Sequence, residues 1–179
     1  MTPSESVERL RTRLGRAGTV TALLETHTGE PLRAEVVGQG PVPAGADNGL
    51  GVAAGRMVTY RTAVLKGGVT DAPYVYAETI YLPERLPDLA RADLEHGDDP
   101  IGRILVAHGL VLSREPFTPT GDTRPPDGLE ARLGCEFVWW RAYRLLVGGV
   151  PVFAIGEWFT RAALGALGGP SPAQSEPAG

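Results

Sequence analysis

The sequence predicts an α+β domain built around a mostly antiparallel sheet. Segments with the apolar spacing of helices and segments with the alternation of strands follow one another in the order helix, hairpin, hairpin, two helices, hairpin. The strand-like segments come in pairs separated by short turns that contain glycine or proline, which favours antiparallel pairing. The chain has 179 residues, a length typical of one domain that can bury a substantial core.

The first predicted helix begins at a capping signal. Thr2 is a good N-cap residue, Pro3 suits the first helical position, and Glu5 stands where a capping box needs an acid. Apolar residues then recur at helical spacing until Gly18 ends the pattern.

The first predicted hairpin follows this helix. Residues 19–25 and 32–37 have the composition of strands, and the Gly-Glu-Pro sequence at residues 29–31 between them is typical of a turn. Residues 38–51 are rich in glycine and proline and have no apolar period, so they are predicted to form a loop.

The second predicted hairpin and two helices occupy the middle of the chain. Residues 52–66 and 74–81 are strand-like and flank a turn that contains glycine and proline. A helix within residues 83–94 is expected to start near Pro87. A second helix is expected within residues 99–109, where an Asp-Pro pair provides the start and a glycine the stop.

The last predicted hairpin has the strongest turn signal in the chain. Residues 137–147 and 150–160 are strand-like and are joined by two glycines. Residues 111–117 are expected to form one more strand, and residues 116–128 a polar, proline-rich excursion.

Composition excludes several classes of function. Hydrophobic residues make up 42% and charged residues 21% of the chain, and its net charge is −4, so the broad cationic surface of a nonspecific nucleic-acid-binding protein is not expected. Cys135 is the only cysteine and the three histidines are scattered, so neither an internal disulfide nor a metal site is expected. A single cysteine fits a reducing cytoplasm best, so a cytoplasmic protein is expected. No signal peptide and no membrane span are apparent in the sequence. One domain over residues 1–165 and a flexible Pro/Gly-rich tail over residues 166–179 are expected.

Charged residues within apolar strand-like runs are the candidate functional residues. They are Arg61, Glu78, Arg141, Arg144 and Glu157. One interpretation places them on the solvent-exposed face of alternating strands. The other places several of them in a pocket, because a buried charge must be paired or used. Arginine and glutamate in a pocket lined by tryptophan and tyrosine would suit a small anionic ring compound, with arginine holding carboxylates and glutamate acting as an acid.

At these residues the chain resembles the chorismate pyruvate-lyase family, and most closely its actinobacterial and archaeal branch. Six motifs match in order over about residues 8–160, each weak alone but together typical of one fold. The motifs are Leu10-Arg11 through Gly18-Thr19-Val20-Thr21, Arg61–Gly67, Tyr76–Ile80, Arg85-Leu86-Pro87, Pro100–Leu105, and Tyr143-Arg144 with Gly148-Gly149, Pro151, Glu157 and Phe159.

The resemblance implies a chorismate lyase-like fold, in which a six-stranded antiparallel sheet has helices packed on one side and a buried pocket. It also implies loss of pyruvate from chorismate to give 4-hydroxybenzoate, with no metal or other cofactor. By this resemblance Arg61 would hold the ring carboxylate, and Glu157 would be the general acid on the leaving side. The other residues expected to contact the substrate are Glu78, Arg141, Tyr143, Arg144, Trp139 and Trp158.

Departures from the family pattern keep two further functions open beside an enzyme that supplies 4-hydroxybenzoate to a specialised-metabolite pathway. Ala142 stands where the branch has an arginine, Gly156 stands where threonine is usual, and the tryptophans add bulk. A repurposed pocket would then cyclise or isomerise a larger biosynthetic intermediate. The same architecture also serves as the UTRA ligand-sensing domain of transcription regulators, although no DNA-binding domain is expected on this short acidic chain. In each case the expected partner is a small molecule rather than nucleic acid or a membrane.

Overall fold

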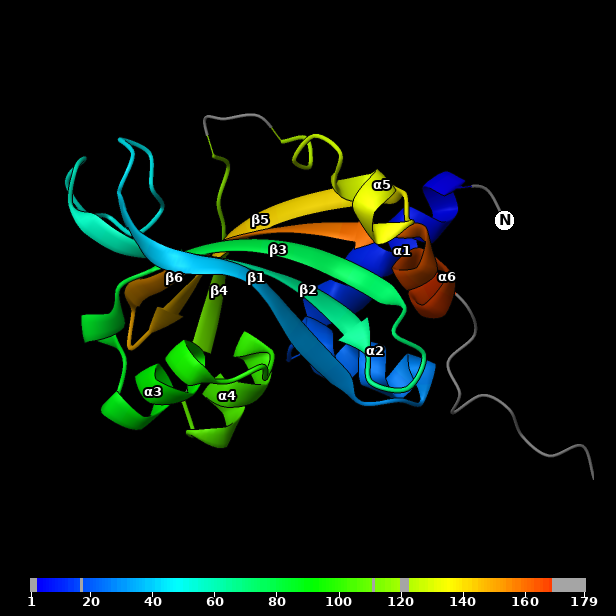
Figure 1. The fold of residues 1–179 in the computed structure, drawn as a ribbon, viewed down its shortest axis with the longest axis horizontal. Helices are drawn as coiled ribbons and strands as arrows, with labels where there is room; N and C mark the ends of the chain where they lie inside the picture. Colours follow the sequence, from blue (N-terminus) through cyan, green and yellow to red (C-terminus); the bar gives the residue numbers. More distant parts are fainter. Residues whose placement is uncertain (1–2, 17, 111, 120–122, 169–179) are drawn as a thin grey trace, which may run out of the picture.

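One six-stranded sheet forms the centre of the computed structural model, which describes residues 3–16, 18–110, 112–119 and 123–168 (Figure 1). Its strands are β1 (Leu32–Pro43), β2 (Met57–Gly67), β3 (Pro73–Tyr81), β4 (Leu112–Pro116), β5 (Phe137–Val147) and β6 (Val150–Thr160). They lie in the order β1-β2-β3-β6-β5-β4, and every neighbouring pair is antiparallel. The predicted α+β class and six-stranded antiparallel sheet are confirmed.

Two groups of helices cover one face of the sheet. The first group is α1 (Pro3–Arg16), α2 (Val20–Thr28) and α6 (Arg161–Gly168), and the second is α3 (Asp88–His96) and α4 (Ile101–Ala107), preceded by the 3-10 turn η1 (Pro83–Arg85). Each group packs on its own apolar cluster, and Figure 1 shows them near opposite ends of the strands. None of the described helices combines the length and the apolar composition that a membrane-crossing helix needs.

A short sixth helix, α5 (Leu129–Leu133), lies on the other face. Its Leu129 is buried in a cluster with Val64, Tyr76 and Trp158. Most helices therefore lie on one face of the sheet, as expected, and α5 covers a small part of the opposite face.

Successive side chains along β6 serve both faces of the sheet. Phe159 belongs to the cluster beneath α1, α2 and α6, whereas Trp158 belongs to the cluster beneath α5. Glu157 points with Phe159 toward the helices, and Gly156 lies on the face of Trp158. Because β6 is central and buried on both sides, both faces of the sheet can carry internal sites.

The prediction of a strand over residues 19–25 is wrong, because this segment is the helix α2. The Thr19 hydroxyl accepts a hydrogen bond from the Ala22 backbone N–H at 3.1 Å, which is an N-cap, and Gly29 ends the helix in the left-handed region with φ of 73°. The β-branched residues that suggested a strand instead place one side of a helix in the core. The next segment, β1, was expected to pair with residues 19–25 and pairs instead with β2.

The other differences concern the ends of elements. β1 continues to Pro43, so the predicted loop over residues 38–51 begins later. Neither α5 nor α6 was expected, and α6 buries Leu167 against the core. Helix α6 thus continues past the predicted boundary at residue 165 to Gly168. The rest of the predicted tail, like the Thr2 cap, lies outside the described residues.

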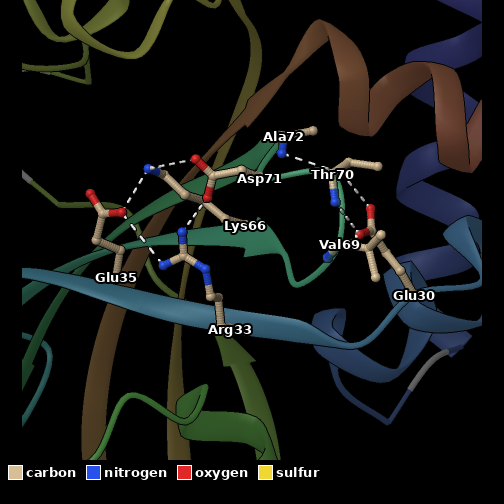
Figure 2. Close-up of polar contacts among 8 residues, drawn as sticks. All are labelled: Glu30, Arg33, Glu35, Lys66, Val69, Thr70, Asp71 and Ala72. Atoms are coloured by element: carbon tan, nitrogen blue, oxygen red, sulfur yellow. Dashed lines mark hydrogen bonds and ion pairs between the residues drawn. The ribbon is translucent and has the colours of Figure 1, made fainter.

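The turn between β2 and β3 is held by the carboxylate of Glu30 (Figure 2). It accepts hydrogen bonds from the backbone N–H groups of Val69 and Thr70, both at 2.9 Å, from the Thr70 hydroxyl at 2.7 Å and from the Tyr74 hydroxyl at 3.0 Å. The carboxylate fills the space above Gly67, where an added Cβ would lie 2.2 Å from Glu30 Oε1. These donors, the Thr70 side chain first, lower the pKa of Glu30 to about 2.

Replacement of Glu30 should alter how stability depends on pH. Because its pKa is lower in the folded than in the unfolded protein, the ionised carboxylate stabilises the fold above pH 4.5, and this contribution is lost as pH falls toward about 2. We expect Glu30→Gln to lower the urea midpoint at neutral pH and to lose less additional stability on acidification than the parent. Glu8→Gln, at an exposed position on α1, is the control. Parallel pH profiles for the parent and Glu30→Gln would refute the assignment.

Candidate functional site

A cavity of about 240 Å³ lies on the helix-covered face, between the sheet and the first residues of α2 and α4. We term it the helix-side pocket. Its main polar side chains are Arg61, Thr79, Arg114, Tyr143 and Glu157. Much of the remaining wall is apolar and includes Ala63, Leu65, Ala77, Ile101, Leu145 and Ile155. A mostly apolar cavity with a few convergent polar groups is typical of a small-molecule site.

Arg61 is the most unusual group in this pocket. Its side chain is 1% exposed, and Nη1 donates to the Leu94 carbonyl oxygen and, at 3.2 Å, to Gln39 Oε1. Its Nε and Nη2 are also buried, but they have no hydrogen-bond partner among the described residues. Burial lowers the pKa of Arg61, yet a guanidinium stays charged in proteins. The group is therefore a buried cation with one edge unsatisfied.

That free edge has the geometry of a carboxylate receptor. Nε and Nη2 are the two nitrogens of a guanidinium that donate in parallel to both oxygens of one carboxylate. A buried donor without a partner costs about 1–3 kcal/mol. Arg61 lines the pocket and has two such donors, so an anion that reached them would relieve this cost.

Both carboxylate oxygens of Glu157, in contrast, accept hydrogen bonds from other side chains of the protein. Glu157 is 4% exposed, its Oε2 accepts from Arg141 Nε at 2.7 Å, and its Oε1 accepts from the Tyr143 hydroxyl at 2.9 Å. Arg141 and Glu157 face each other across β5 and β6, so strand register holds the pair. Burial and then the charge of Glu157 raise the pKa of Tyr143, which keeps its hydroxyl proton available for donation.

Arg114 of β4 is a pocket residue that the sequence analysis did not identify. Its guanidinium carbon lies 4.8 Å from the centre of the Tyr143 ring, and Nη2 donates to the Gly18 carbonyl oxygen at 3.3 Å. Its Nε is buried without a hydrogen-bond partner among the described residues. The pattern that identified Arg61, a charged residue inside a predicted strand, also applies to Arg114, which lies in the predicted strand over residues 111–117. It supplies a second cation to the helix-side pocket.

The structure divides the sequence-predicted residues between the two faces of the sheet. Arg61, Tyr143 and Glu157 line the helix-side pocket, and Arg141 joins them through its ion pair with Glu157. Glu78 does not join them, because it follows Ala77, which lines that pocket, and adjacent strand residues point to opposite faces.

Three further predicted residues also lie outside this pocket. Trp158 lines a second cavity on the opposite face with Glu78. Arg144 is bound to Glu115 at 2.7 Å. Trp139 packs on Phe159 with ring centres 4.9 Å apart, beside the apolar cluster of the first helix group. Strand alternation therefore separates Trp158 and Arg144 from Arg61. Trp139 shares the helix-covered face with Arg61, but it packs in the apolar cluster of the first helix group and does not line the pocket.

Comparison with known proteins establishes the fold. No family model and no curated protein sequence matches the chain. The effector domain of PhnF from Mycobacterium smegmatis has 14% identity and a TM-score of 0.53, covering 81% of this chain and 90% of that domain. The C-terminal domain of the histidine utilization repressor from Pseudomonas syringae pv. tomato has 15% identity and a TM-score of 0.54, covering 74% and 93%. Against the longer PhnF structure, the chain spans 65% of the length.

These regulator domains share the chorismate lyase-like fold that the sequence predicts. At such identities the similarity concerns the fold alone. It does not extend to membership of the chorismate pyruvate-lyase family.

Breaking the Arg141–Glu157 pair should be costly. We expect Glu157→Gln to destabilise the protein by about 3–5 kcal/mol, because it leaves the largely buried Arg141 guanidinium without its counter-charge. Adding Arg141→Met to this variant should restore much of the loss. Urea unfolding measures both effects. Glu136→Gln, which breaks an exposed pair with Arg161, should cost less than about 1 kcal/mol, and an equal cost at both sites would contradict a buried pair.

Proposed function

We propose that this chain is a ligand-binding domain that holds a small organic acid in the helix-side pocket. The observation that carries the proposal is the unsatisfied edge of Arg61, a buried bidentate donor at a largely apolar cavity. The fold supports it, because solved domains with this fold include the effector domain of PhnF and the C-terminal domain of a histidine utilization repressor.

The charge of the pocket favours an anion. Arg61 and Arg114 have no carboxylate within ion-pair distance among the described residues, whereas Glu157 is neutralised by Arg141. The pocket therefore carries uncompensated positive charge. The carboxylate of the ligand would face Arg61. A second polar group of the ligand would be within reach of Arg114 on β4.

The size of the pocket favours a compact ligand. Its volume of about 240 Å³ lies below the roughly 300–1,000 Å³ of sites for drug-sized molecules. A single ring with one or two acidic groups suits this space better than the larger biosynthetic intermediate that the cyclase alternative requires. A pocket of this volume is compatible either with sensing a small acid or with catalysis on one.

A lyase is the second candidate, and one observation favours it. Arg61 and Glu157 line the same pocket, as the resemblance to chorismate pyruvate-lyases requires. However, both Glu157 oxygens already accept hydrogen bonds, which suits an ionised carboxylate rather than the protonated acid of that mechanism. The contacts thus support anion binding more directly than proton transfer.

Calorimetric titration tests the binding proposal. Benzoate and 4-hydroxybenzoate should bind saturably, and the neutral analogue benzamide at least tenfold more weakly. Arg61→Met should weaken binding of the acids at least about 100-fold, since two charge-assisted hydrogen bonds are lost, and Arg61→Lys should retain part of it. Arg56→Met, at an exposed arginine, is the matched control. Equal affinity for acid and amide, or no saturable binding, would rule the proposal out.

Incubation with chorismate tests the lyase. Pyruvate release, followed by lactate dehydrogenase and NADH oxidation, should exceed the uncatalysed rate and fall by at least about 100-fold in folded Glu157→Gln if that glutamate is the acid. Saturable acid binding without pyruvate release would leave the chain a binding domain.

A further inference from the structure

A second cavity, of about 200 Å³, lies on the face of the sheet opposite the helix-side pocket. We term it the aromatic pocket. Four aromatic side chains line it, from β2, β5, β6 and the segment after β4: Tyr60, Trp140, Trp158 and Phe117. Its acidic residues are Glu78 of β3 and Asp47. Nothing in the proposed function uses this cavity.

Small residues on the central strands make room for this pocket. Ala142 and Gly156 are paired across β5 and β6, and Gly156 also faces Glu78 across β3 and β6. A Cβ at Gly156 would lie 3.3 Å from Trp158 Cη2 and 3.7 Å from Trp140 Nε1. Both indoles therefore approach the bare backbone at Gly156, and the hollow lies among the rings and the carboxylate.

The carboxylate of Glu78 has no cationic partner among the described residues. Its oxygen Oε1 accepts a hydrogen bond from the Tyr76 hydroxyl at 3.0 Å, and it forms no ion pair within the described part of the chain. Arg144, which lies on the same face, is bound to Glu115. Burial and then the charge of Glu78 raise the pKa of Tyr60 to about 12, so Tyr60 is neutral at physiological pH. Glu78 is thus a partly buried negative charge among neutral aromatic rings.

Aromatic faces and a nearby carboxylate together form a receptor for a positive charge. The negative face of an indole or phenol ring attracts an ammonium group, and the attraction grows when the site is desolvated. The cation indicated is organic, because the lining offers mainly ring faces, which attract an ammonium group, whereas hard metal ions take several oxygen ligands. An apolar ligand would leave the Glu78 charge unpaired, which argues against a neutral occupant.

We propose that the aromatic pocket binds a small organic ammonium ion, with Trp140, Trp158 and Tyr60 around its substituents and Glu78 opposite its charge. The proposal is independent of acid binding in the helix-side pocket. The two pockets lie on opposite faces of the same strands and have opposite charge preference.

The probe is choline, and 3,3-dimethylbutan-1-ol is its neutral counterpart of nearly equal shape. Choline should quench tryptophan fluorescence saturably and give a matching calorimetric isotherm. The neutral alcohol should bind at least tenfold more weakly. Benzyltrimethylammonium and phenethylamine extend the series to larger and primary ammonium ions. If none of the three cations binds saturably, or if the alcohol binds as well as choline, the proposal is overturned.

Variants at two residues locate the binding. Glu78→Gln keeps the size of the side chain but removes its charge, and should weaken choline binding at least tenfold. Trp140→Phe should weaken it less than Trp140→Leu, because phenylalanine keeps a ring face. Glu8→Gln removes the same charge from an exposed position on α1 and should have no effect. Unchanged affinity in folded Glu78→Gln, or competition between choline and 4-hydroxybenzoate for one site, would refute the aromatic pocket as the receptor.

Discussion

The pairing of β3 with β6 is the constraint on which both pockets depend. It joins the β2–β3 hairpin to the β5–β6 hairpin and sets Ala77 opposite Glu157 and Glu78 opposite Gly156. Because side chains alternate along a strand, a shift of this pairing by one residue would exchange the two faces of one hairpin relative to the other. Arg61 and Glu157 would then no longer share a cavity. The chemistry of each face is therefore a consequence of register between hairpins that are distant in sequence.

Arg141 and Arg61, both on the helix-covered face, show how differently buried charge can be used. Arg141 and Glu157 compensate each other within the fold, whereas Arg61 is held at one nitrogen and left open at two. A buried ion pair contributes little net stability compared with apolar packing, although breaking it is costly. An open guanidinium edge instead costs stability, and this cost is the physical basis of the binding proposal.

The local parts of the fold could be predicted from sequence, and the non-local parts could not. The β5–β6 hairpin is encoded by two glycines between strand-like runs, and the structure has it at the expected residues. Helix α2 was misread because its β-branched residues resemble a strand, while its Thr19 cap is a weaker local signal. The charged residues inside strands were recognised, but their division between two faces depends on tertiary pairing. Glu78 and Trp158 consequently line a separate pocket rather than the one with Arg61. Arg114, which lines the pocket with Arg61, was not predicted.

The most direct test of this account is a crystal structure of the protein with bound 4-hydroxybenzoate. The account predicts the ligand in the helix-side pocket, with its carboxylate oxygens within hydrogen-bond distance of Nε and Nη2 of Arg61 and the Arg141–Glu157 pair unbroken. Ligand density in the aromatic pocket, or a ligand in the helix-side pocket whose carboxylate avoids Arg61, would contradict it.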